Sequence, residues 1–140
     1  MLRIEHLNLV VRNLPRSLAF YSAALPHWRV RGEGEQDWYG THRRWLHFGD
    51  DYNYLTLNDH GQGDNRDLQG NTVGLAHFGL EVSDLDAVVA RLAKVGYQKA
   101  KPGSDDPHRK NVYFVDPDGF EVEFVEYTSD QPAERNLYRE

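Results

Sequence analysis

The sequence predicts an α+β fold built from two βαβββ modules, and three observations lead to this class. Two stretches match when His6 is placed over His77, so that Ile4–Val11 lies over Leu75–Val82. Each stretch is followed by a polar pair and then by a leucine that opens a helical pattern. Strand-like segments follow each helical pattern. The same order of features twice in one chain indicates an internal duplication.

The first module, residues 1–58, starts with a strand over residues 3–11 in which the side chains alternate between two faces. A helix is expected next, because Asn13 can cap its first turn and Pro15 suits a position where no N–H bond is lost. Apolar residues then recur at helical spacing until Pro26 ends the run. Three more strands are expected, over residues 28–34, 42–49 and 53–58.

The second module, residues 75–127, repeats this order after a polar, glycine-rich linker over residues 59–74. Its helix is capped by Ser83 or Asp84 and ends near Gly96. The polar tail, residues 128–140, is predicted to be an arm or disordered. The expected elements are a strand over 75–82, a helix over 85–95, and strands near 97–101, 110–116 and 119–127, with a turn at Asp116–Gly119 between the last two.

One helix covers only one face of a four-stranded sheet, so neither module is expected to fold alone. Pairing the modules is expected to give a curved, mixed eight-stranded sheet with the helices on its outer face. The opposite, concave face would then enclose a cavity for a metal or ligand, and function is expected there.

Composition excludes several classes of protein. The chain of 140 residues has 16 Lys and Arg against 22 Asp and Glu, a net charge of −6, which argues against nucleic-acid and anionic-membrane partners. It has no cysteine, which excludes disulfides, thiolate zinc sites and a cysteine nucleophile. No signal peptide or membrane-length apolar run is evident, so a cytoplasmic protein is expected.

Candidate metal ligands lie on the face opposite the helices. The leucines of the first strand are expected to face the helix, which turns His6 toward the cavity, and His77 takes the equivalent position in the second copy. In the last strand, Glu121 and Glu123 alternate with apolar residues and share the cavity face. Two imidazoles and a carboxylate with open positions form the facial triad of non-haem iron and related divalent ions. A histidine in a strand is more often structural, and the residues alone leave both readings open.

The strand histidines, the duplication and the stretch Asp116-Pro-Asp-Gly-Phe-Glu-Val-Glu123 together resemble the glyoxalase/bleomycin-resistance/extradiol-dioxygenase group, the vicinal oxygen chelate superfamily. The resemblance covers residues 3–127. It implies metal ligation by His6, His77 and Glu123, with Thr56 at the fourth ligand position, where glyoxalase I enzymes usually have Glu or a similar ligand. A set of His, His and Glu resembles extradiol dioxygenases and fosfomycin-resistance thiol transferases instead.

The resemblance also assigns candidate roles in substrate binding and catalysis. Tyr113 lies ten residues before Glu123, at the spacing of a substrate-binding tyrosine in the fosfomycin-type transferases. A phenol beside a metal can also donate a hydrogen bond to a forming oxyanion, so Tyr113 and Glu123 are the catalytic candidates. Thr56, Tyr113 and His108 are the substrate-binding candidates, and His60 and His108 could act as acid or base groups in loops.

The expected function is therefore that of a divalent-metal-dependent enzyme, with one Fe, Mn, Ni or Zn ion per site. Its substrate would be a small metabolite that chelates the ion through adjacent oxygens, with lyase, isomerase or dioxygenase chemistry. Two alternatives stay open: a non-catalytic binding protein like the bleomycin-resistance proteins, and a fosfomycin-type thiol transferase. The resemblance also implies a homodimer, in which His6 of one chain could join His77 and Glu123 of the other.

Overall fold

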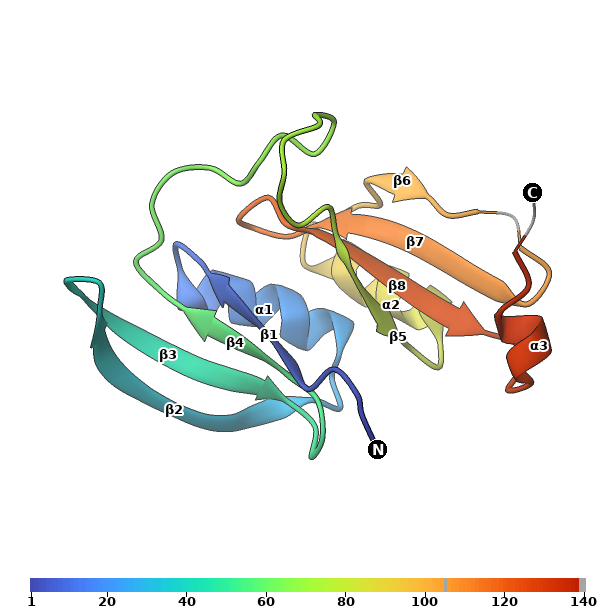
Figure 1. The fold of residues 1–140 in the computed structure, drawn as a ribbon, viewed down its shortest axis with the longest axis horizontal. Helices are drawn as coiled ribbons and strands as arrows, with labels where there is room; N and C mark the ends of the chain where they lie inside the picture. The colour runs from blue at the N-terminus through green and yellow to red at the C-terminus, as the bar shows by residue number, and fades with distance from the viewer. Residues whose placement is uncertain (105, 139–140) are drawn as a thin grey trace. The chain divides into compact units, whose positions relative to one another are not determined.

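The computed structural model describes residues 1–104 and 106–138, and the chain divides into two compact units, Met1–Asp64 and Asn65–Glu140. The first unit contains β1 (His6–Val10), α1 (Leu14–Ala24), β2 (Arg29–Trp38), β3 (Thr41–Gly49) and β4 (Tyr54–Asn58). The second contains β5 (Phe78–Glu81), α2 (Leu85–Lys94), β6 (Lys101–Pro102), β7 (Arg109–Val115), β8 (Glu121–Tyr127) and α3 (Pro132–Arg135). Figure 1 shows a sheet in each unit, with α1 in the first unit and α2 in the second.

The two sheets have the same topology, which confirms the predicted duplication of a βαβββ module. Their strand orders are β1-β4-β3-β2 and β5-β8-β7-β6, and in each the first strand pairs in parallel with the last. The other neighbours are antiparallel. The α+β class is therefore confirmed, with one correction: the eight strands form two sheets of four rather than a single eight-stranded sheet. Strand β1 is an edge strand of the first sheet and β5 is an edge strand of the second, so each has one hydrogen-bonded neighbour.

Helices α1 and α2 each pack on one face of the sheet in their own unit. In the first unit the core joins Phe20 and Tyr21 of α1 to Leu55 and Leu57 of β4, all at most 1% exposed. In the second unit the fully buried residues include Val88 and Leu92 of α2 and, on β7 and β8, Phe114, Val122 and Phe124. The alternate residues of the strands therefore face away from the helix, and the candidate ligands lie among them.

Side-chain caps begin α1 and α2 where the sequence predicts them. Asn13 accepts from the N–H of Arg16 at 3.0 Å, and Asp84 accepts from the N–H of Ala87 at 3.0 Å. The Asp116–Gly119 turn is built as expected, since Asp116 Oδ1 accepts from the N–H of Phe120 at 2.9 Å and Gly119 has a φ of 90°. Glycine is favoured there because a side chain would be strained at positive φ.

The linker residues divide between the units. Gly61 N–H donates to the carbonyl of Val11 at 2.8 Å, within the first unit. Asn65 Nδ2 donates to the carbonyl of Gly119 at 2.8 Å, within the second. In the described residues, no helix is both long and apolar enough to cross a membrane.

The tail was predicted to be an arm or disordered, but it contains the short helix α3. Arg135 joins this helix to β5 and β8 of the second unit. Its guanidinium lies 3.0 Å from a carboxylate oxygen of Glu81 and 3.7 Å over the ring of Tyr127. These contacts come from distant side chains, so a search for helical periodicity over four residues could not find the helix.

Candidate metal centre

A histidine and a glutamate lie within hydrogen-bond distance on the second sheet. His77 Nε2 is 3.1 Å from Glu123 Oε2. The pairing of β5 with β8 explains this contact: Gly79 lies opposite Glu123, and His77 lies two residues before Gly79, on the same face of the chain. The structure therefore brings together two of the three residues that the sequence suggests as ligands.

Asn111 holds the carboxylate of Glu123. Its Nδ2 donates to Glu123 Oε1 at 2.8 Å, and its Oδ1 accepts from the N–H of Ser104 at 2.9 Å. Asn111 lies opposite Val125, so it reaches Glu123 diagonally across β7 and β8. Glu123 Oε1 is thus occupied by an amide donor, and Oε2 is the oxygen that faces His77.

Glu121 lies on the other side of the His77 ring. Its Oε1 is 3.9 Å from His77 Nδ1 and 3.0 Å from Lys101 Nζ. The side chain of Glu121 is only 10% exposed, and the ammonium group of Lys101 compensates its buried charge. His77 therefore has Glu123 at Nε2 and Glu121 on the Nδ1 side.

Tyr113 lies directly opposite Glu123 in the register of β7 and β8. Its ring meets the ring of His77 edge-on, with centroids 5.3 Å apart, and Lys101 Nζ lies 4.4 Å over it. Burial, followed by the negative charge of Glu123, raises the pKa of the Tyr113 phenol. The hydroxyl therefore stays protonated at neutral pH and remains a hydrogen-bond donor beside the histidine and glutamate.

His6 takes the equivalent position in the first unit. His6 lies two residues before Asn8, and Asn8 is opposite Thr56. In the same way, His77 lies two residues before Gly79, and Gly79 is opposite Glu123. Thr56 thus occupies the position of Glu123, and it is 7% exposed. His47 lies opposite Thr56, where the second unit has Tyr113.

The ring of His6 is held by two neighbours. It stacks on Tyr54, with centroids 4.8 Å apart and planes 9° from parallel, and its Nδ1 lies 3.0 Å from Glu5 Oε1. Tyr54 donates its hydroxyl hydrogen to the same oxygen at 3.2 Å. The bond from His6, followed by that from Tyr54, lowers the pKa of Glu5. Because a carboxylate only accepts hydrogen bonds, a hydrogen bond from neutral His6 to Glu5 requires the ring hydrogen on Nδ1.

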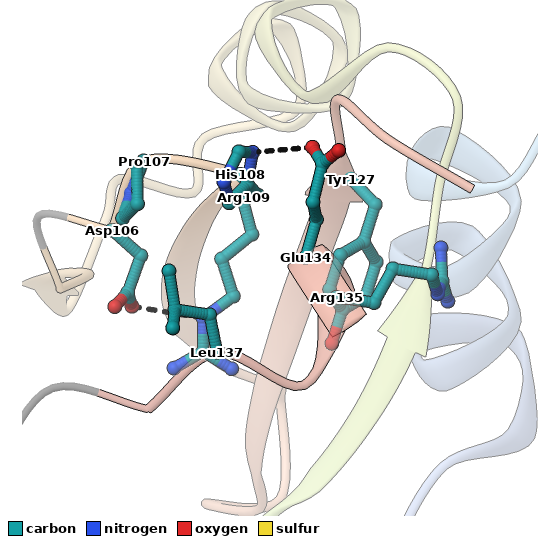
Figure 2. A pocket seen from close by; sticks show the side chains of 8 residues that line it. All are labelled: Asp106, Pro107, His108, Arg109, Tyr127, Glu134, Arg135 and Leu137. Carbon is teal, nitrogen blue, oxygen red and sulfur yellow. Dashed lines mark hydrogen bonds and ion pairs between the residues drawn. The ribbon is translucent and has the colours of Figure 1, made fainter. Parts of the chain in front are cut away.

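The other two candidate histidines lie elsewhere. His108 lines a pocket near α3, where its Nδ1 is 3.1 Å from Glu134 (Figure 2). His108 is separated from Tyr113 along the strand: the next residue, Arg109, lies four positions before Tyr113 on β7, a length of about 13 Å. The side chains around this pocket pair with one another, as Arg109 does with Asp106 at 2.9 Å. His60 lies in the linker, with Nε2 3.8 Å from Asp59.

The His77–Glu123 pair is compatible with an octahedral divalent ion. The 3.1 Å between Nε2 and Oε2 is that of an ordinary hydrogen bond. It is also close to the roughly 3.0 Å between two ligand atoms that lie at right angles about 2.1 Å from an ion. Imidazole nitrogen and carboxylate oxygen suit zinc and related ions. Within the described part of the chain, no group of three or more His, Asp or Glu side chains is assembled around one point.

The family model of the Glyoxalase/Bleomycin resistance protein/Dioxygenase superfamily matches residues 3–124. The chain belongs to this superfamily. No curated protein matches the sequence. Membership confirms the resemblance carried by the strand histidines and the Asp116–Glu123 stretch.

Solved structures of the glyoxalase superfamily share the fold at low identity. A glyoxalase family protein from Bacillus cereus is 14% identical, with a TM-score of 0.75 over 92% of this chain and 96% of that chain. A glyoxylase/bleomycin resistance protein/dioxygenase domain from Frankia sp. EAN1pec is 23% identical, with a TM-score of 0.73 over 98% and 99%. The fosfomycin resistance protein FosX from Listeria monocytogenes, crystallised with Mn(II) and sulfate, is 18% identical, with a TM-score of 0.65 over 98% and 99%.

Sequence reasoning missed three neighbours of the candidate ligands: Asn111 and Lys101 in the second unit, and Glu5 in the first. Asn111 carried a usable signal, because it alternates with Val112 and so shares the face of Tyr113. Lys101 is found only once β6 is paired with β7, which places it opposite Tyr113. Glu5 precedes His6 directly, and its approach to the His6 ring depends on Tyr54 from another strand.

Proposed function

We propose that this protein is a divalent-metal-dependent enzyme of the glyoxalase superfamily. Its substrate would be a small metabolite that presents two adjacent oxygens. The observation that carries the proposal is the His77–Glu123 pair at 3.1 Å, with the second oxygen of the carboxylate held by Asn111 at 2.8 Å. Asn111 occupies one oxygen of Glu123 and leaves the other directed at the histidine, which is the arrangement that a metal ligand requires.

His6 is the proposed third ligand, because the duplication gives it the same position as His77. A bound divalent ion would supply Lewis-acid stabilisation of negative charge on the substrate oxygens. Thr56 at the fourth position offers a hydroxyl rather than an imidazole or carboxylate, which suits contact with substrate more than metal ligation. The ions considered are Fe, Mn, Ni and Zn, and FosX crystallised with Mn(II) supports including manganese.

The neighbouring side chains would prepare the site for negative charge. Tyr113 would donate a hydrogen bond to a substrate oxyanion, since its raised pKa keeps the phenol protonated. Asn111 keeps Glu123 oriented, and Lys101 balances the charge of Glu121. Lyase, isomerase and dioxygenase chemistry are all compatible with this set, and the preferred ion would separate oxygen chemistry from Lewis-acid chemistry.

A metal titration tests this proposal. Protein purified without nickel and treated with chelator is titrated with Mn(II), Ni(II), Zn(II) and, under anaerobic conditions, Fe(II). We expect about one tight site per chain, with affinity lowered by about 100-fold or more in His77→Ala and Glu123→Gln, since even substitutions around the ligands cost 10- to 100-fold. His27→Ala and Glu33→Gln are matched controls on exposed residues of the first unit and should bind as the wild type does.

Absence of tight binding in the wild type would overturn the proposal. The chain would then be better described as a ligand-binding protein of the bleomycin-resistance type. Equal binding by wild type and Glu123→Gln would refute the ligand assignment while leaving a metal site elsewhere. The predicted homodimer and cytoplasmic location are further proposals, and sedimentation at micromolar concentration tests the first.

A fosfomycin-type thiol transferase is a second candidate, because Tyr113 lies opposite Glu123 and next to His77. Incubation of the metal-loaded protein with fosfomycin, with and without a low-molecular-weight thiol, tests it. Loss of the epoxide only when thiol is present would favour the transferase. An unchanged epoxide in both would remove this candidate and leave the broader proposal in place.

A further inference from the structure

Both strand histidines have a carboxylate on the Nδ1 side of the ring, but the carboxylates come from different positions. Glu5 Oε1 is 3.0 Å from Nδ1 of His6, and Glu121 Oε1 is 3.9 Å from Nδ1 of His77. Tyr54 lies two residues before Thr56, which is opposite Asn8. Glu121 lies two residues before Glu123, which is opposite Gly79. Tyr54 of the first unit therefore corresponds to Glu121 of the second. The first unit therefore has a tyrosine where the second has the carboxylate, and its carboxylate comes from the residue before the histidine.

Tyr54 makes the Glu5–His6 contact more than a pair of adjacent surface side chains. An exposed ion pair alone is weak and does not fix a ring, and Glu5 is 63% exposed. Here the tyrosine ring lies parallel to the imidazole, and the tyrosine hydroxyl donates to the same Glu5 oxygen that accepts from Nδ1. The three groups limit both the plane of the imidazole and the nitrogen that carries its hydrogen.

We propose that Glu5, supported by Tyr54, is a positioning residue that holds His6 in the Nδ1–H tautomer and leaves Nε2 free to bind the metal ion. A histidine ligand commonly donates its other N–H to a carboxylate, which orients the ring and makes the ligating nitrogen more basic. This inference rests on the proposed function for its purpose, but the tautomer itself is a property of the metal-free protein.

The tautomer is measured first, on metal-free protein labelled with ¹⁵N-histidine, from the nitrogen shifts of His6 at a pH where the ring is neutral. We expect hydrogen on Nδ1 in the wild type and a shift toward Nε2–H in Glu5→Ala. Glu5→Gln retains an acceptor oxygen and should keep the Nδ1–H form, and Tyr54→Phe should weaken the preference. Glu33→Ala, an exposed carboxylate of the same unit, should change nothing. An Nε2–H tautomer in the wild type, or no response to Glu5→Ala, would overturn the inference.

Metal affinity is measured second, on the same variants with Mn(II). We expect Glu5→Ala to raise the dissociation constant by about 10- to 100-fold and Glu5→Gln to raise it less. If the wild type binds no ion but the tautomer results hold, the proposed function fails while the positioning of His6 by Glu5 is retained. If the wild type binds tightly and Glu5→Ala binds equally well, the inference fails and the proposed function is retained.

Discussion

Asn111 shows how one amide can orient the carboxylate of a candidate ligand. It occupies Glu123 Oε1 and is itself fixed by the N–H of Ser104, so the direction of Glu123 Oε2 depends on it. Alternation with Val112 places Asn111 on the face of Tyr113, but its contact with Glu123 runs diagonally between two strands and does not follow from alternation. The sequence could predict the faces of His77 and Glu123 from alternation alone, but not the side chain that orients them.

The substitution Asn111→Ala should therefore weaken metal binding without removing a ligand. We expect the dissociation constant for Mn(II) to rise by about 10-fold, because Glu123 loses its orientation and keeps its charge. Calorimetric titration measures this. Asn136→Ala, at an exposed asparagine of the same unit, is the control and should match the wild type. An unchanged affinity in Asn111→Ala would mean that the amide has no part in the site.

The longer strands and helices were the most predictable elements, because alternation, helical spacing and caps are local signals. The first copy was predicted closely: its helix begins at Leu14 after the Asn13 cap, and its last strand covers Tyr54–Asn58. Short elements were less predictable. Strand β6 has only two residues, and its position depends on pairing with β7. Helix α3 depends on Arg135 contacting Glu81 and Tyr127.

The buried aromatic pair of β7 and β8 should dominate the stability of the second unit. Phe114 and Phe124 are fully buried, with ring centroids 6.0 Å apart at 73°. We expect Phe124→Ala to lower the free energy of unfolding by about 3–5 kcal/mol, because it removes buried area and leaves a cavity. Urea denaturation measures the change. Tyr138→Ala, at a residue 77% exposed, should stay within about 0.5 kcal/mol of the wild type, and a similar small effect for Phe124→Ala would contradict this packing.

The hairpin of β2 and β3 should carry a pH-dependent contact at His42. Hydrogen bonds to Asp37, at 2.7 Å, and then to Glu35 raise the pKa of His42. The charged form is thus favoured in the folded hairpin, so this contribution to stability is fully present below the ordinary histidine pKa and is lost as pH rises through the folded-state pKa. An NMR titration should give a His42 pKa above the ordinary value, and Asp37→Asn should lower it. The same pKa in both proteins would show that Asp37 does not interact with His42 in solution.

At the scale of the whole molecule, the duplication and the superfamily could be predicted from sequence, since both rest on features spread over residues 3–127. The family model matches residues 3–124. The division into two sheets of four could not, because alternation fixes the face of a strand and not its hydrogen-bonded neighbours. Sequence pattern gives His6 and His77 equivalent positions in the two copies, and it gives no distance between them.

If the site draws ligands from two chains of a homodimer, two defective variants should complement each other. His6→Ala and His77→Ala should each lose tight Mn(II) binding. Mixed dimers would contain one site with both histidines and one site with neither, so mixing after subunit exchange should restore up to one tight ion per mixed dimer. No recovery, with exchange verified by mass spectrometry, would indicate that each site is built within one chain or that His6 is not a ligand.

The most direct test of the central claim counts histidine nitrogens on a bound ion. Pulsed electron paramagnetic resonance of the Mn(II)-loaded protein, labelled with ¹⁵N-histidine, detects each imidazole that ligates the ion. The account predicts two imidazole couplings in the wild type and one each in His6→Ala and His77→Ala, at Mn(II) concentrations high enough to load the variants. No imidazole coupling in the wild type, or two couplings that survive both substitutions, would contradict it.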